Sequence, residues 1–249
     1  FDDVDAAFQM HLNKVNYMQT RALAMNSCEF EFIGKAAHAA AFPENGINAL
    51  DALILTFNGI SALRQQLTSD VRIHGIITDG GTAANVIPEH CKANFYVRAA
   101  RKATFLDAFE KVKNCARGAA TMTGCELKIN MYENQFDDLQ ENPVLAEVLE
   151  KYLVEAGVGP FPKDEPSPGS TDVGNVSYRC PTLYSEIGVA GGKIAVHEED
   201  FLPVANGPEA KENILKVVEG FACTAIELSQ NPDLVKEARK VFEESVSVG

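Results

Sequence analysis

Five histidines are the side chains of this sequence best suited to bind a metal ion or transfer a proton. His197 lies in KIAVHEEDF, at the end of an apolar run that reads as a strand and directly before three acidic residues. Acidic neighbours can orient an imidazole and raise its basicity, so a metal ligand or general base and a solvated acidic turn remain equal alternatives. His11 follows the strand-like run AFQM and leaves the same alternatives open.

The other three histidines have structural interpretations on local pattern alone. His38 stands among alanines in GKAAHAAAFPENG, where core packing is the default role. His74 alternates with apolar residues in RIHGII, which indicates a sheet-surface or packing role. His90, in IPEHCK, is predicted to lie in a turn.

Two loops and one strand add polar side chains that could contact a ligand. The stretch GSTDVGN contains Gly169, Ser170 and Asp172; its backbone N–H groups could surround an anion, or Asp172 could cap a helix. It lacks the lysine of a phosphate-binding loop. Asn85 lies in the glycine-rich turn GGTAANVIP, and Arg98 interrupts the apolar strand NFYVRAA. A guanidinium in that strand indicates either a carboxylate clamp or a structural ion pair.

Composition narrows the class of partner. The 249 residues carry a net charge of −13, which argues against nucleic acid or an anionic membrane, because both bind clustered lysine and arginine. No apolar run approaches the ~18 residues of a membrane span. The six cysteines are scattered without a CxxC pair, which favours reduced thiols in the cytoplasm over a disulfide framework.

The middle of the chain predicts a compact α/β unit that would position these side chains. Alternating residues indicate strands, and residues at helical spacing indicate helices. The order strand, helix, strand, strand, helix, strand is that of a ferredoxin-like βαββαβ domain, which we place at residues 28–137. The strands are expected over 28–35, 71–81, 91–100 and 125–132, and the helices over 44–67 and 102–124, with Gly124 ending the second helix.

Residues 1–27 and 138–249 predict a second α/β domain into which the first is inserted. Helices are expected over 142–157 and 209–231, with a last helix to about Glu244, and a short strand over 181–189. Residues 138–249 show about two strands, fewer than the ~5–6 of an average sheet. This domain is therefore expected to be partial.

Five stretches, taken together and in this order, resemble the M20 family of metallopeptidases and amidohydrolases. The likeness is greatest to its aminobenzoyl-glutamate hydrolase and M20 domain-containing dipeptidase-like branch, and it covers essentially the whole chain. It implies a catalytic α/β domain interrupted by a βαββαβ lid, and hydrolysis of an amide next to a free carboxylate by metal-activated water. The stretches are GKAAHAAAFPENGINALDA (34–52), RIHGIITDGGTAANVIPEH (72–90), YVRA (96–99), PSPGSTDVGNVS (166–177) and VHEEDF (196–201).

The resemblance gives each candidate residue a role. His11 and His197 match ligands of a site for two Zn²⁺ ions, or for another divalent ion such as Mn²⁺. His38 matches a lid histidine that donates to the substrate carbonyl, in dimeric relatives within the neighbouring subunit's site, and we expect it to face a hinge. Asn85 and Arg98 match lid positions that hold the substrate carboxylate. The loop that lines the pocket is matched by Gly169, Ser170 and Asp172.

Members of the family also carry an HxD-type ligand motif, a bridging acidic ligand and a Glu-Glu pair ahead of the lid, and these motifs are absent here. We therefore expect this chain to be the lid and C-terminal half of a longer enzyme, inactive alone and binding zinc weakly or not at all. His38, Arg98 and His197 favour a zinc amidohydrolase or dipeptidase that acts on a small amide or peptide as a homodimer through its lid. The alternative is a non-catalytic relative that keeps the lid for dimerisation and carboxylate binding.

Overall fold

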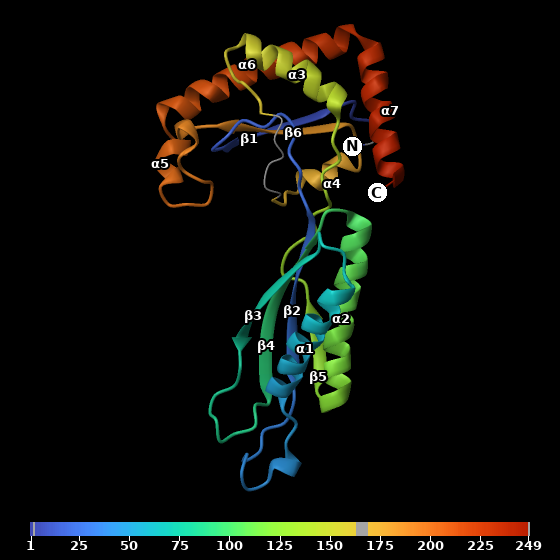
Figure 1. Ribbon diagram of the computed structural model, residues 1–249, viewed down its shortest axis with the longest axis vertical. Helices are drawn as coiled ribbons and strands as arrows, with labels where there is room; N and C mark the ends of the chain where they lie inside the picture. The colour runs from blue at the N-terminus through green and yellow to red at the C-terminus, as the bar shows by residue number, and fades with distance from the viewer. Residues whose placement is uncertain (2, 163–168, 249) are drawn as a thin grey trace. The chain divides into compact units, whose positions relative to one another are not determined.

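The computed structural model describes residues 1, 3–162 and 169–248, which divide into two compact units (Figure 1). One unit contains residues 24–136, and the other contains residues 1–23 together with 137–249. The chain leaves the second of these units after Leu23 and re-enters it at Asp137. The 24–136 unit is therefore an insertion in the sequence of the other, and we call it the inserted unit.

The inserted unit has the element order that the sequence predicted, which confirms its βαββαβ fold. Its four strands form one antiparallel sheet in the order β3-β4-β2-β5. The central strands are therefore the first and third along the chain, as expected for a ferredoxin-like unit. The elements are β2 (Ala24–Ile33), α1 (Ala49–Leu63), β3 (Arg72–Asp79), β4 (His90–Ala99), α2 (Lys102–Thr123) and β5 (Glu126–Asn130), with short 3-10 turns at η1 (Pro43–Asn45) and η2 (Arg64–Gln66).

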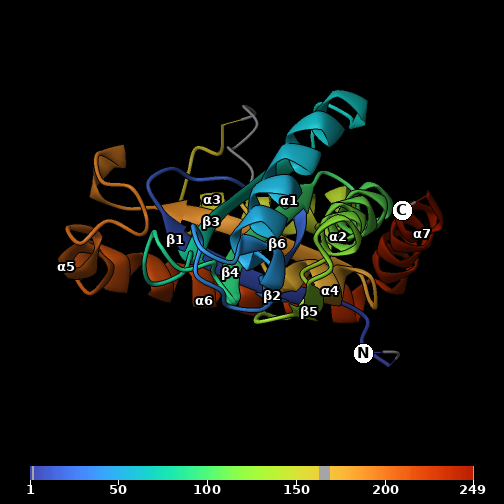
Figure 2. The same ribbon diagram turned by 90° about the horizontal axis from the view of Figure 1, so that it is seen from below.

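Helices α1 and α2 pack on one face of this sheet and leave the other face uncovered (Figure 2). Every second residue of β4, beginning with Cys91, is buried, and the residues between them are half-buried. Phe30 and Phe32 of β2 and Phe105 of α2 are fully buried in the same core. This period of two is the pattern from which the strands were predicted.

The first helix of the inserted unit begins later than its sequence pattern predicted. Residues Pro43–Asn45 form a separate turn, and Asn48 accepts hydrogen bonds from the backbone N–H groups of Leu50 (3.0 Å) and Asp51 (3.3 Å). An asparagine side chain is among the strongest N-caps. The helix therefore starts at Ala49, after this cap, rather than directly after the proline.

The second unit is built on a two-stranded parallel sheet. Strand β1 (Ala7–Asn13) pairs with β6 (Thr182–Gly188), so segments from opposite parts of the chain share the sheet. Of the two or so strands expected within 138–249, the described part of that segment contains one, β6, which lies where a strand was predicted over 181–189. Its other elements are α3 (Pro143–Glu155), α4 (Val173–Ser177), η3 (Ala190–Gly192), α5 (Phe201–Ala205), α6 (Pro208–Gln230) and α7 (Pro232–Val248).

Helices α3 and α6 pack against each other over this small sheet (Figure 1). Leu145, Leu149 and Leu153 lie at helical spacing on α3 and share a core with Leu183 and Ile187 of β6. A two-stranded sheet is marginal by itself, so these helices supply the apolar contacts that it needs. In the ranges that the structure describes, no helix is both long and apolar enough to cross a bilayer.

A charged cluster lies on the uncovered face of the inserted sheet. His90 is the first residue of β4, not the turn residue that the sequence predicted, because it pairs with Ile33 of β2. Its Nε2 lies 2.8 Å from Glu31 Oε1 and its Nδ1 lies 3.0 Å from Asp79 Oδ2. The hydrogen bond to Glu31, and then that to Asp79, raises the pKa of His90 above its ordinary value. The cluster thus joins β2, β3 and β4 through one imidazolium.

This geometry predicts a pH-dependent contribution to stability. A raised pKa in the folded state stabilises the fold fully below the unfolded-state value of about 6.5, and this stabilisation disappears as the pH rises through the folded-state pKa. His90→Gln should therefore lower the urea midpoint at pH 5.5 and leave it nearly unchanged at pH 9. Because the side chains are partly exposed, the loss should stay below about 1 kcal/mol.

The control is Lys236→Gln, which removes an exposed ion pair with Asp233. It should change the urea midpoint by the same small amount at both pH values. An equal loss of stability at pH 5.5 and pH 9 for His90→Gln would contradict the charged state assigned to the cluster.

Candidate functional site

His38 lies in a loop beyond the end of β2, which stops at Ile33. Backbone pairing ties this loop to the one that follows β3: His38 bridges Val86, and the Ala39 N–H donates to the Asn85 carbonyl (3.0 Å). The structure thus brings the loops of two predicted site residues, His38 and Asn85, together. His38 and Asn85 are both exposed.

The His38 ring also caps its own turn. The backbone N–H groups of Ala40 and Ala41 both donate to Nδ1, at 3.3 and 3.2 Å. Because Nδ1 acts as the acceptor, a neutral ring carries its hydrogen on Nε2, and that group is left to donate to another acceptor. Because His38 is also exposed, core packing, the default role from local sequence, is wrong for this residue.

Two glycines of GKAAHAAAFPENG allow this loop to close. A Cβ on Gly34 would lie 2.1 Å from the Ile47 carbonyl oxygen, and a Cβ on Gly46 would lie 2.5 Å from Cδ1 of Ile87. The backbone pairing of Lys35 with Ile47 takes place at this close approach. Packing thus requires glycine at Gly34, where the close atom belongs to the backbone, whereas at Gly46 the end of the Ile87 side chain could move aside.

Arg98 lies at the opposite end of the sheet from the His38 loop. It pairs with Met25, at the start of β2, whereas His90 pairs with Ile33, at the end of β2. At ~3.3 Å per residue, the eight steps between these pairs separate the two ends by about 26 Å. Met25 also bridges Phe136, so Arg98 marks the end where the chain enters and leaves the inserted unit.

It follows that Arg98 and Asn85 of one chain do not meet. The expectation that His38 faces a hinge is also wrong, because the strand leading to it runs away from the point where the chain enters the unit. Arg98 itself is half-buried, with its guanidinium carbon 5.7 Å from the centre of the Tyr96 ring. Arg98 does not interrupt the buried apolar residues of β4. It lies on the uncovered face of the sheet, whereas those residues point to the opposite face.

His11, one of the two predicted metal ligands, lies inside β1 rather than after it. Its exposed ring is 6.2 Å from the ring of Tyr184, and it is in register with Glu186 of the neighbouring strand. Glu186 is buried and accepts a hydrogen bond from Asn13 Nδ2. Burial raises the pKa of Glu186, while Asn13 and the charge of His11 act in the opposite direction. Sequence reasoning missed this carboxyl, although an acid within the apolar run PTLYSEIGV was a usable signal.

His197, the second predicted ligand, lies in a turn before α5 and not at a strand end. Its backbone has a φ of 69°, in the left-handed region that side chains other than glycine rarely adopt. The ring is exposed. Across residues 1, 3–162 and 169–248, no group of three or more His, Cys, Asp or Glu side chains is placed to hold a metal ion.

The loop predicted to line the pocket, which contains Gly169, Ser170 and Asp172, lies directly before α4. Gly169 accepts a hydrogen bond from the Leu23 N–H (2.8 Å), and Ser170 is half-buried beside it. Asp172 precedes α4, but its side chain makes no capping hydrogen bond, so the capping role was wrong. Its backbone is already helical, with φ −68° and ψ −12°, which is not the extended geometry of an N-cap. Residues 166–168 of this motif lie outside the described residues.

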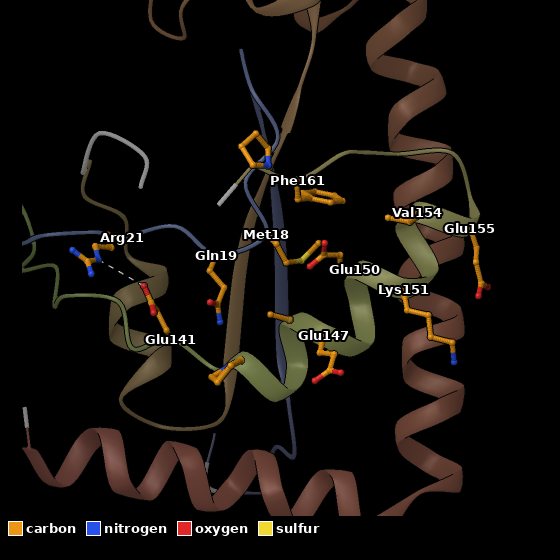
Figure 3. A pocket seen from close by; sticks show the side chains of 13 residues that line it. Met18, Gln19, Arg21, Glu141, Glu147, Glu150, Lys151, Val154, Glu155 and Phe161 are labelled. Atoms are coloured by element: carbon orange, nitrogen blue, oxygen red, sulfur yellow. Dashed lines mark ion pairs between the residues drawn. The ribbon is translucent and has the colours of Figure 1, made fainter. Parts of the chain in front are cut away.

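A large cavity of the second unit, about 870 Å³, lies beside α3 and contains none of the predicted site residues (Figure 3). One side is formed by α3, with Glu147, Glu150 and Lys151, and the other by the segment after β1, with Met18. Its acidic side chains outnumber its basic ones. The cavity is therefore separate from the candidate residues described above.

Residues 24–120 match the model of the peptidase dimerisation domain of the M20 family. The chain is 31% identical over 246 residues to the Xaa-Arg dipeptidase of Mus musculus, a match that covers 97% of this chain and 57% of the relative. It is 37% identical over 125 residues to one component of the p-aminobenzoyl-glutamate hydrolase of Escherichia coli K12, covering 49% of this chain and 26% of that relative. The chain thus spans about half the length of the dipeptidase relatives it matches.

Among solved structures, an aminobenzoyl-glutamate utilization protein from Klebsiella pneumoniae has a TM-score of 0.70 to this chain. The match covers 91% of this chain and 55% of that one, at 22% identity, and it establishes a shared fold. The resemblance to the M20 family is confirmed. The chain carries the M20 peptidase dimerisation domain, inserted in a second α/β unit.

The close approach at Gly34 predicts that the stability and conformation of the His38 loop depend on this glycine. In Gly34→Ala the new methyl group meets the Ile47 carbonyl, which should cost about 1–3 kcal/mol of unfolding free energy. It should also shift the amide resonances of Ala40 and Ala41, which report the His38 cap. Urea unfolding and a ¹H–¹⁵N spectrum measure both effects.

Gly118→Ala is the matched control, because no heavy atom lies within 4 Å of its new Cβ on α2. It should stabilise the chain by about 0.5–1 kcal/mol, as expected for glycine in a helix interior. If Gly34→Ala is as stable as the wild type, the packing role given to this glycine is incorrect.

Proposed function

We propose that this chain is part of a zinc-dependent amidohydrolase or dipeptidase that cleaves an amide bond next to a free carboxylate. The relation to the Xaa-Arg dipeptidase and to the p-aminobenzoyl-glutamate hydrolase supports this class. A dipeptide and an acyl-glutamate both carry a carboxylate beside the amide. The substrates we infer are therefore small N-acyl amino acids or dipeptides.

The hydrogen bonding of the His38 ring is the observation that carries the proposal. With Nδ1 occupied by the amides of Ala40 and Ala41, the Nε2–H can donate to a substrate carbonyl oxygen. A donor of this kind stabilises the negative charge that develops on that oxygen when water adds to the carbonyl. His38 thus acts as a hydrogen-bond donor rather than as a metal ligand.

The positions of Arg98 and Asn85 favour a homodimer. A small substrate is far shorter than the separation of about 26 Å between Arg98 and the His38 loop. A substrate held by Arg98 of one protomer would therefore meet His38 and Asn85 of the other. The match of residues 24–120 to a dimerisation domain supports this arrangement.

The metal ligands in this chain would be His11 and His197. Imidazoles are ligands that zinc prefers, but two of them are fewer than the three or four protein ligands of zinc sites. His11 and His197 thus provide the type of ligand that zinc prefers, but they are too few to form a complete zinc site. Bound zinc would polarise the carbonyl and lower the pKa of water. The exposed ring of His11, in register with the buried Glu186, and the exposed ring of His197 are the features that support this assignment.

The complete site would also need residues from outside this chain. The coverage of only 57% of the dipeptidase relative supports this part of the proposal. We expect the remaining metal ligands and the general base there, so this chain alone would not turn over substrate. Its compartment would be the cytoplasm, where buried thiols such as Cys28, whose pKa burial raises to about 12, stay reduced.

Removing His38 tests the proposed reaction in the full-length protein. His38→Ala should lower kcat by ~10²–10³, the range for the loss of one oxyanion donor, with zinc content near that of the wild type. His38→Asn keeps an acceptor near the Nδ1 position but no outward donor, so it should be as slow as His38→Ala. Hydrolysis of p-aminobenzoyl-glutamate and of dipeptides, with zinc measured by elemental analysis, provides the readout.

His90→Gln, assayed at pH 9, is the control, because this histidine lies outside the proposed site. Loss of zinc from His38→Ala would show that a metal ligand had been misassigned. A zinc-loaded wild-type protein that leaves these substrates intact would favour the non-catalytic alternative.

A further inference from the structure

The uncovered face of the inserted sheet carries a group of aromatic and charged side chains around Tyr96. We call this group the Tyr96 cluster: His74 of β3, Tyr96 and Arg98 of β4, and Tyr132 and Glu133 after β5. All five belong to the inserted unit. None of them is part of its buried core, so packing of the helices does not account for the group.

The Tyr96 ring is contacted from three directions. His74, its cross-strand partner, stacks on it with ring centres 5.7 Å apart and planes inclined by 14°. Tyr132 meets it edge-on at 5.8 Å. The guanidinium carbon of Arg98 lies 5.7 Å from its centre, within the range of a cation–π interaction. His74 and Tyr132 thus hold the Tyr96 ring in one orientation, and the ring in turn supports the guanidinium of Arg98.

A hydrogen bond also holds the hydroxyl group of Tyr96 in place. Its hydroxyl donates to Glu133 Oε1 at 2.5 Å. This bond to a carboxylate raises the pKa of Tyr96 to about 12, so the phenol stays protonated and remains a donor. The ring therefore stays neutral and electron-rich beside the guanidinium.

The imidazole of His74 adds no competing charge. Burial, and then the positive charge of Arg98, lower the pKa of His74 below its ordinary value. A neutral imidazole stacks on the phenol without repelling the guanidinium or drawing an anion away from it. Arg98 is thus the cation that the cluster presents.

We propose that Tyr96 and His74 are positioning residues that preorganise Arg98 to bind the carboxylate of the substrate. The inference rests on the proposed function, which assigns the carboxylate to Arg98, and it goes further by saying what makes that arginine selective. A long arginine side chain loses rotamer freedom when it binds, and a rigid aromatic support reduces that loss. The geometry of the guanidinium then favours a planar carboxylate over a neutral amide.

Carboxylate binding to the 249-residue chain tests this proposal directly. The probe is N-acetylglycine, with N-acetylglycinamide as the uncharged counterpart, at constant ionic strength. The ring resonances of His74, assigned from the spectrum of His74→Gln, report binding because His74 senses the charge of Arg98. N-acetylglycine should shift them with saturation, the amide should not, and Arg98→Gln should abolish the shift.

Two variants separate positioning from folding. Tyr96→Phe keeps the ring and loses the bond to Glu133, and Glu133→Gln alters only an exposed acceptor; each should raise the Kd about threefold to tenfold. Lys92→Gln, which removes a cation elsewhere on the same face, should leave the Kd unchanged. In the full-length enzyme, Tyr96→Phe should raise KM for carboxylate substrates with little change in kcat.

The outcomes distinguish this inference from the proposed function. Absence of a saturable shift in the wild-type chain, or an unchanged Kd in both folded variants, overturns the positioning role. If the shift and its loss are observed but the full-length protein hydrolyses no N-acyl amino acid or dipeptide, the carboxylate site stands and the hydrolase assignment fails.

Discussion

The antiparallel pairing of β2 with β4 is the constraint on which the arrangement of the candidate site depends. Its register places Arg98 opposite Met25 and His90 opposite Ile33, at the two ends of the sheet. A slip of one residue would move Arg98 from the uncovered face into the core under the helices, so burial fixes this register strongly. The same pairing fixes the loop of His38 at the end remote from Arg98. The separation of the two groups is thus a property of the sheet and not of a flexible loop.

This separation gives the inserted unit two ends that could each contact a substrate. At one end, Arg98 rests on a tyrosine that a carboxylate and a histidine hold in place. At the other end, the turn around His38 is closed by backbone amides that fix its tautomer. Each end is built locally from β-sheet and turn geometry. Under the proposed function, a second copy of the chain would bring the two ends to one small substrate, and the match to a dimerisation domain supports that arrangement.

The fold of the inserted unit could be predicted because its signals are local. Period-two burial marks β4, and Gly124 ends α2 in the left-handed conformation with a φ of 77°. The site was harder to predict from the sequence. Only the family motif indicated a functional role for His38. The acceptor role of its Nδ1 depends on the turn that brings the N–H groups of Ala40 and Ala41 to the ring, which the sequence does not show. Glu186 and Tyr96 were missed because their partners, Asn13 and Glu133, lie far away in sequence. The sequence predicted His197 at the end of a strand because an apolar run does not reveal a backbone with positive φ.

The most direct test of the central claim, that one site uses opposite ends of two chains, is complementation between two variants of the full-length protein. His38→Ala and Arg98→Ala protomers, co-expressed with different tags, form mixed dimers in which one of the two sites keeps both groups. If the two groups act from different protomers, the mixture should recover about one quarter of the wild-type rate, because half of the dimers are mixed. A rate no higher than the average of the two separate variants would contradict the account.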